Sequence, residues 1–124
     1  MKLLLVDDEK AIRSVVSAVL EMHGFHIDTA ASAGEAKQIL HAGRFDVVLT
    51  DLRMETETAG FEVVSAAAQL APRPRIVILT ACPVPAAVWR PMGADALVQK
   101  GASPVDLVNL LKRLTAPQEN ARRS

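Results

Sequence analysis

The stretch Lys2-Leu3-Leu4-Leu5-Val6 runs directly into Asp7-Asp8-Glu9, so that a short apolar run ends in three acids. Similar apolar runs recur at residues 25–30, 46–50, 75–80 and 96–99, and segments with helical periodicity separate them. Runs that are almost continuously Val, Leu and Ile are typical of parallel strands buried on both faces. Their alternation with helical segments predicts an α/β fold, a single doubly wound sheet of five parallel strands flanked by five helices.

Residues at the ends of the predicted helices support this alternation. Gly24 marks the end of a first helix over about residues 9–22. Ser32 with Glu35 three residues later is typical of a capping box, which begins a second helix. Ser103 followed by Pro104 predicts the start of the last helix, because proline is favoured at the first helical position.

The composition is that of one compact globular domain. The 124 residues are 50% hydrophobic and 23% charged, and 14 basic side chains balance 14 acidic ones. Because a net charge of zero provides no overall field for holding nucleic acid or an anionic membrane, we expect neither to be a direct partner. The single cysteine, Cys82, excludes an internal disulfide, and the N-terminal apolar run is too short for a signal peptide or a membrane span. A cytoplasmic location is therefore expected.

Polar side chains follow the predicted strands at the points where they end. Asp7-Asp8-Glu9 follow the first strand and Asp51 follows the third, while Thr80 and Lys100 close the fourth and fifth. Since ligands of open parallel sheets bind outside the carboxyl ends of the strands, these groups are expected at one edge. Clustered carboxylates favour Mg²⁺ or a similar hard cation. A metal, a hydroxyl and an ammonium around one aspartate predict a site where an anion, most naturally a phosphoryl group, is transferred onto that aspartate.

The ordered set of motifs resembles the receiver domain of two-component response regulators over about residues 1–115. The matching stretches are Leu4-Leu5-Val6-Asp7-Asp8-Glu9, Asp46-Val47-Val48-Leu49-Thr50-Asp51-Leu52-Arg53-Met54, Ile78-Leu79-Thr80-Ala81 and Gly93-Ala94-Asp95 leading to Lys100. The resemblance implies the strand order 2-1-3-4-5. It also implies that Asp51 is the phosphoacceptor and that Mg²⁺ is held by Asp8, Asp51 and the backbone carbonyl of Arg53, with Asp7 bound through water. Thr80 and Lys100 would contact the phosphoryl oxygens.

The same resemblance implies a role in phosphorelay signalling. A histidine kinase or a histidine phosphotransfer protein would donate the phosphoryl group to Asp51, and the aspartyl phosphate would switch a partner-binding surface within residues 82–114, used by a downstream protein or a second copy of the chain. Enzymatic activity would be limited to self-phosphorylation and self-dephosphorylation. Residues 1–115 would form the receiver domain, and residues 116–124 a flexible tail or the start of a linker.

Several positions depart from the family pattern. Leu97 stands where an aromatic residue is usual, which predicts an altered or weakened switch. Gly101 replaces the usual proline after Lys100, so a trans peptide is expected there. The segment 55–59 replaces a proline-containing turn and is one residue longer, and its acids, Glu55 and Glu57, are expected in solvent rather than at the cation site.

The segment before the fifth strand departs furthest. Pro83, Pro85 and Pro91 leave room for at most a turn or two of helix around residues 86–90. Cys82 is expected to be a small buried thiol rather than a redox sensor, and Trp89 either anchors a partner or is partly buried over the fourth strand. This segment predicts an unusual partner or an unusual dimer.

Other functions and roles stay open. A degenerate receiver would keep the fold and act through protein contacts alone. A Mg²⁺-dependent phosphatase working through an aspartyl-phosphate generally has a second acid two residues after its nucleophile, where this chain has Arg53. The Arg53 side chain either reaches over the phosphoryl group or points to solvent. Asp7 or Asp8 could instead cap the first helix.

Overall fold

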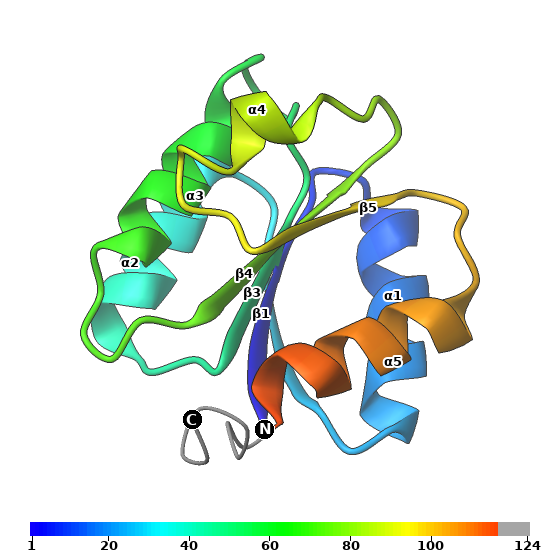
Figure 1. Ribbon diagram of the computed structural model, residues 1–124. Helices are drawn as coiled ribbons and strands as arrows, with labels where there is room; N and C mark the ends of the chain where they lie inside the picture. Colours follow the sequence, from blue (N-terminus) through cyan, green and yellow to red (C-terminus); the bar gives the residue numbers. More distant parts are fainter. Residues whose placement is uncertain (117–124) are drawn as a thin grey trace, which may run out of the picture.

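The computed structural model describes residues 1–116, which form five strands and five helices (Figure 1). Their order along the chain is β1 (Lys2–Val6), α1 (Lys10–Met22), β2 (His26–Ala30), α2 (Ala33–Ala42), β3 (Val47–Thr50), α3 (Ala59–Ala68), β4 (Arg75–Thr80), α4 (Ala86–Trp89), β5 (Ala96–Gln99) and α5 (Pro104–Thr115). All neighbouring strands are parallel, and the sheet order is β2-β1-β3-β4-β5. The predicted fold class and strand order are confirmed.

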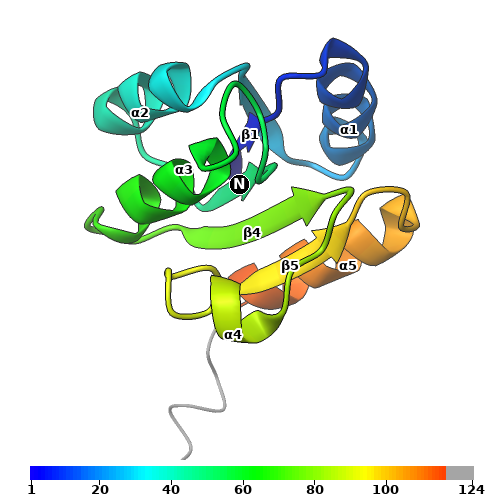
Figure 2. The same ribbon diagram turned by 90° about the horizontal axis from the view of Figure 1, so that it is seen from above.

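The helices cover both faces of the sheet, as the view from above shows (Figure 2). Because side chains of a strand point alternately to the two faces, Leu4 and Val6 pack toward α2 and α3, whereas Leu3 and Leu5 pack toward α1 and α5. All four side chains are at most 1% exposed. Because each strand contributes side chains to a hydrophobic core on both faces of the sheet, its successive residues must all be apolar. This requirement explains the continuous apolar runs of the sequence.

The predicted helix boundaries are largely confirmed. Ser32 Oγ accepts a hydrogen bond of 3.1 Å from the Glu35 N–H at the start of α2. Gly24, which follows α1, has a φ of +89°, a conformation that glycine adopts without strain. Pro104 is the first residue of α5, but the Ser103 side chain makes no capping hydrogen bond, so the helix start depends on the proline alone.

The segment between β4 and β5 contains the short helix that the prolines predicted. α4 has four residues, and Trp89 at its end is buried in the core on the α2 and α3 side, with 8% exposure. The expectation of a buried Cys82 is wrong, because this residue lies in the connection that follows β4, outside the buried strand, and its thiol is exposed. Pro85 keeps the chain extended up to the first residue of α4.

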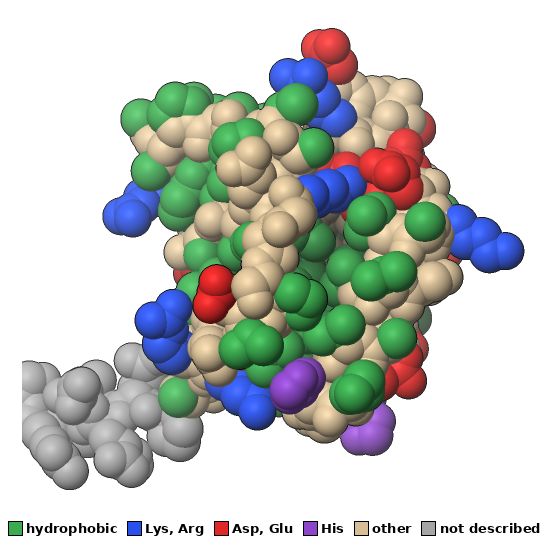
Figure 3. All heavy atoms as spheres, turned by 90° about the vertical axis from the view of Figure 1, so that its right-hand side faces the viewer, with side chains coloured by type: hydrophobic (Ala, Val, Ile, Leu, Met, Phe, Trp, Pro, Cys, Tyr) green, Lys and Arg blue, Asp and Glu red, His purple; other side chains and the backbone are tan. Residues whose placement is uncertain are grey.

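A groove lies on the other face, between α1 and α5. It contains a cavity of about 190 Å³ whose lining is largely apolar and includes Val16, Leu79, Val98 and Leu107. Hydrophobic side chains gather along this face of the molecule (Figure 3). No helix within residues 1–116 is both long enough and apolar enough to cross a membrane. The tail expected from residue 116 lies, apart from Ala116, outside the described residues.

Candidate functional site

Asp51 follows the last residue of β3 and lies at the centre of the candidate site. Its N–H donates a 2.9 Å hydrogen bond to the carbonyl of Val6, which fixes the end of β3 beside the end of β1. Its Oδ1 accepts a 2.7 Å hydrogen bond from the N–H of Leu52. Asp51 is 7% exposed, so its carboxylate is largely withdrawn from bulk water while one side of it faces the sheet edge.

Asp7 follows β1 and is the most deeply buried acid of the site, with 1% exposure. Its N–H donates to the carbonyl of Ala30 at 3.0 Å, and its Oδ1 accepts the N–H of Glu9 at 2.9 Å. The second bond orders the chain just before α1, but α1 has no side-chain capping hydrogen bond, so Asp7 does not cap this helix.

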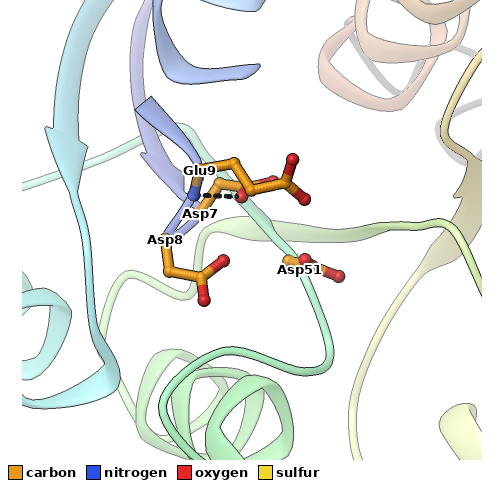
Figure 4. Close-up of side chains that lie close together, drawn as sticks. All are labelled: Asp7, Asp8, Glu9 and Asp51. Atoms are coloured by element: carbon orange, nitrogen blue, oxygen red, sulfur yellow. Dashed lines mark hydrogen bonds between the residues drawn. The ribbon is translucent and has the colours of Figure 1, made fainter. Parts of the chain in front are cut away.

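Four carboxylates meet at this edge (Figure 4). Asp7, Asp8, Glu9 and Asp51 each place one carboxylate oxygen within 4.8 Å of the others, and Asp8 and Glu9 are exposed. Asp7, Asp8 and Glu9 come together because they follow one strand, and Asp51 joins them because the neighbouring parallel strand ends at the same edge. The fold therefore brings together the four acids that were expected at this edge.

Lys100, just after β5, reaches into this cluster. Its N–H donates to the carbonyl of Thr80 at 2.8 Å, and its Nζ lies 2.8 Å from Oδ2 of both Asp51 and Asp7. Asp7 Oδ2 receives no well-directed hydrogen bond and is compensated by this ion pair. The Lys100–Gly101 peptide is trans as expected, and Gly101 turns the chain with a φ of +92°. The trans bond thus leaves the ammonium aimed at the two acids.

Burial alone would lower the pKa of Lys100, because a buried ammonium loses its hydration. The hydrogen bond to Asp51, the close contact with Asp7 and the negative charges of both acids outweigh that effect and raise the pKa above its ordinary value. The Lys100 side chain is 12% exposed. It is therefore a fixed positive charge at neutral pH, held between the two buried acids.

Thr80 and Arg53 form no hydrogen bond or ion pair with the four acids of the site. Thr80 ends β4 at the same edge and is 2% exposed, and within residues 1–116 its hydroxyl hydrogen bonds only with the N–H of Cys82, at 3.2 Å. The structure thus places the hydroxyl at the expected edge without a bond to Asp51. The Arg53 side chain is exposed and forms no hydrogen bond or ion pair with a described residue.

Glu55 is exposed and lies outside the acid cluster, as expected, and its carboxylate accepts the N–H of Ala33, the first residue of α2, at 2.9 and 3.2 Å. Neither this hydrogen bond nor the close packing of Gly60 was predicted. Gly60 donates its N–H to the carbonyl of Leu52 at 2.8 Å, and a Cβ on it would lie 2.2 Å from the Asp51 carbonyl oxygen. The sequence contained one signal for this close approach, because Gly60 is a glycine at the start of a helix that follows shortly after Asp51.

The acid cluster fits a divalent cation. Its four carboxylates formally exceed the single ammonium by three negative charges, and hard oxygen ligands favour Mg²⁺ or Ca²⁺ over softer metals. A divalent ion would offset the repulsion among acids of which two are buried.

A family model described as the response regulator receiver domain matches residues 3–112. The chain therefore belongs to the family of receiver domains of two-component response regulators. It is 34% identical to the alginate biosynthesis transcriptional regulatory protein AlgB of Pseudomonas aeruginosa over 98% of this chain and 30% of that protein. It is also 34% identical to the photosynthetic apparatus regulatory protein RegA of Rhodobacter capsulatus, over 95% of this chain and 67% of the relative.

The chain thus spans less than a third of the length of AlgB. Because AlgB is named a transcriptional regulatory protein, the prediction that nucleic acid is no direct partner lacks support. Balanced charge within 124 residues says nothing about the remainder of such a relative.

Solved structures agree with the family. A receiver domain protein from Methanospirillum hungatei superimposes with a TM-score of 0.87 at 28% identity, covering 97% of both chains. The chemotaxis response regulator CheY4 of Vibrio cholerae gives 0.81 at 32% identity, over 91% of this chain and 97% of that one. The response regulator TrrA of Thermotoga maritima, solved in complex with Mg²⁺ and BeF, gives 0.82 at 30% identity, over 91% and 97%.

Proposed function

We propose that this receiver domain accepts a phosphoryl group on Asp51 from a histidine kinase or a histidine phosphotransfer protein, with Mg²⁺. The observation that supports the proposal most strongly is the environment of the Asp51 carboxylate. One of its oxygens is 2.8 Å from the fixed positive charge of Lys100, and three further acids capable of holding a cation lie beside it. A carboxylate so placed combines a nucleophile with groups that stabilise the charge of an incoming phosphoryl group.

The proposed transfer forms one bond and breaks one. An oxygen of Asp51 attacks the phosphorus, the P–N bond of the donor phosphohistidine breaks, and the imidazole nitrogen leaves with the bonding electron pair. Lys100 neutralises negative charge on the phosphoryl oxygens, and the Thr80 hydroxyl hydrogen bonds to one of them after rotating away from the N–H of Cys82. Hydrolysis by water later restores the carboxylate, so the chemistry is self-phosphorylation and self-dephosphorylation only.

Mg²⁺ supplies electrostatic stabilisation of the charge that spreads over the transferring group. Asp8, Asp51 and the backbone carbonyl of Arg53 would hold the ion, with Asp7 bound through water. The cluster of acids in this chain and the complex of TrrA with Mg²⁺ and BeF both support this assignment.

We further propose that phosphorylation is read at the surface formed by residues 82–114, by a downstream protein or a second copy of the chain. Val88, Met92 and Val105 are exposed there, which gives a partner apolar surface to bury. Leu97 packs against the core beside α3 and takes the place of an aromatic switch residue. Residues 1–115 act as the receiver unit in this proposal, with the cytoplasm as its location.

A contact-only module is the second candidate. It is favoured by one observation, that the Thr80 hydroxyl accepts a hydrogen bond from the N–H of Cys82 and forms none with Asp51. Such a domain would keep the fold and signal without phosphorylation.

Beryllofluoride, a phosphoryl analogue, separates the two candidates. Two-dimensional NMR spectra with Mg²⁺ and beryllofluoride are expected to show large shifts around Asp51, Thr80 and Lys100 in the wild type and none in Asp51→Asn. Shifts that reach residues 82–114 would support the proposed output surface. A wild type that binds Mg²⁺ but not the analogue would contradict phosphoryl acceptance and favour the contact-only module.

A further inference from the structure

The loop that connects β3 to α3 contains Asp51 at its start and is held by several hydrogen bonds. It has no proline between Leu52 and Gly60, so hydrogen bonds must hold its shape. The N–H of Gly60 donates to the carbonyl of Leu52 at 2.8 Å, and the N–H of Met54 donates to the carbonyl of Thr56 at 3.1 Å. The first bond joins the loop to the second residue of α3 and the second lies within the loop, so neither fixes it relative to the neighbouring loops.

The Glu55 side chain forms hydrogen bonds that reach outside the loop. Both of its carboxylate oxygens accept the N–H of Ala33, at 2.9 and 3.2 Å. That N–H has no partner within α2, because the first N–H groups of a helix point out of its end. The Ser32 side chain accepts the N–H of Glu35 instead, so Glu55 and Ser32 each accept a hydrogen bond from a different N–H group at the start of α2. A charged acceptor is favoured there by the helix dipole.

The segment that Glu55 contacts is itself bound to the candidate site. Ala30, three residues before Ala33, accepts the N–H of Asp7 through its carbonyl at 3.0 Å. Glu55 therefore links the loop that begins at Asp51 to the segment that is hydrogen bonded to Asp7. Beyond the last strand pairs, no other side-chain hydrogen bond within residues 1–116 joins these two connections.

We infer that Glu55 is a positioning residue for the cation site, and this inference rests on the proposed function. By tying the β3–α3 loop to the start of α2, Glu55 holds the Asp51 carboxylate and the Arg53 carbonyl at a fixed separation from Asp7 before the cation arrives. Ligands arranged in advance bind a cation more tightly because no ordering of the loop is needed on binding. Glu55 itself binds no metal in this account.

The test compares Glu55→Ala, Glu55→Gln and Glu57→Ala by Mg²⁺ titration, followed by NMR. Glu57 is exposed, lies in the same loop and forms no hydrogen bond or ion pair with a described residue. Its replacement removes the same charge from the same loop and serves as the matched control. Glu55→Gln keeps an acceptor oxygen for the Ala33 N–H but removes the charge.

Glu55→Ala is expected to weaken Mg²⁺ binding about tenfold, at the low end of the range for groups that support metal ligands indirectly. Amide exchange at Ala33 should become faster in the same variant. Glu55→Gln should retain most of the affinity, and Glu57→Ala should match the wild type. This pattern is not expected of a residue that affects only global stability.

Three results would overturn the inference. An unchanged Mg²⁺ affinity in Glu55→Ala would show that the tie does not position the site. Equal losses in Glu55→Ala, Glu55→Gln and Glu57→Ala would assign the effect to charge alone. A wild type that binds no Mg²⁺ would refute the proposed function, and the inference would fail with it. The titration of the wild type alone distinguishes this result from the first two, in which the wild type does bind Mg²⁺.

Discussion

Replacing Gly60 with alanine is expected to disturb the site, although Gly60 contacts neither a ligand nor an acidic side chain. Gly60 is the second residue of α3, and the helix starts directly against the chain that follows Asp51. A Cβ at this position would lie 2.2 Å from the Asp51 carbonyl oxygen, 2.3 Å from the Leu52 Cα and 2.7 Å from the Leu52 carbonyl oxygen. All three are backbone atoms, so no side chain can rotate away to make room.

The expected size of the effect follows from these distances. Ordinary contact with a Cβ begins at 3.4 Å, so the start of α3 and the Asp51 segment must separate by about 1.2 Å, the difference between 3.4 and 2.2 Å. Overpacking of a tight site costs about 1–3 kcal/mol, and loss of the hydrogen bond from Gly60 to Leu52 adds about 1 kcal/mol. The better helix propensity of alanine returns up to about 1 kcal/mol. The free energy of unfolding should therefore fall by about 1–4 kcal/mol.

Urea unfolding monitored by circular dichroism measures this change, and Gly34→Ala is the matched control. Gly34 lies in the first turn of α2, and a Cβ there would meet nothing within 4 Å. Its replacement should leave the protein equally stable or more stable by up to about 1 kcal/mol. If Gly60→Ala were as stable as Gly34→Ala, the close approach of α3 to the Asp51 segment, and the reasoning built on it, would be refuted.

Three further predictions concern charge and metal. Lys100→Met should tighten Mg²⁺ binding about tenfold or more, because a competing unit charge about 4 Å away is worth roughly 1 kcal/mol in water and about 4 kcal/mol near a protein surface. The same variant should abolish beryllofluoride binding. Unchanged titrations for both ligands would argue against the assigned role of the ammonium. Glu62 forms an ion pair with Lys37 at 2.8 Å, and this contact lowers the pKa of Glu62. The ion pair therefore contributes to stability above the pKa that Glu62 has in the unfolded chain, and this contribution is lost as the pH falls through the lower pKa of the folded state. The difference in urea midpoint between the wild type and Glu62→Gln should therefore shrink below about pH 4, and a difference that grows there would contradict the ion pair. Removal of Mg²⁺ with EDTA should leave the circular dichroism spectrum unchanged, because the core contains no metal ligand, while it eliminates beryllofluoride binding.

The fold could be predicted because burial on both sheet faces leaves a local record in the sequence. The runs Leu3-Leu4-Leu5-Val6 and Val47-Val48-Leu49 are apolar at every position, and only a sheet covered on both sides buries all of them. The order of the strands in the sheet cannot be read from such local patterns. It was predicted from the resemblance to receiver domains and was then confirmed.

The acids of the site could be predicted for the same topological reason. Parallel strands end at one edge, so residues that directly follow β1 and β3 must approach one another. Side chains on loops were harder to predict, because their contacts depend on loop shape rather than on periodicity. Glu55 is exposed as expected, but the hydrogen bond that it accepts at the start of α2 was not predicted, and Cys82 was expected in the core and is exposed.

Phosphorylation of Asp51 tests the central claim most directly. The full chain and its Asp51→Asn variant are incubated with acetyl phosphate and Mg²⁺, and the intact mass of each is measured. The account predicts that the wild type gains the mass of one phosphoryl group, only in the presence of Mg²⁺, and that Asp51→Asn gains none. A folded wild type that gains no mass, or a variant that gains as much as the wild type, would contradict it.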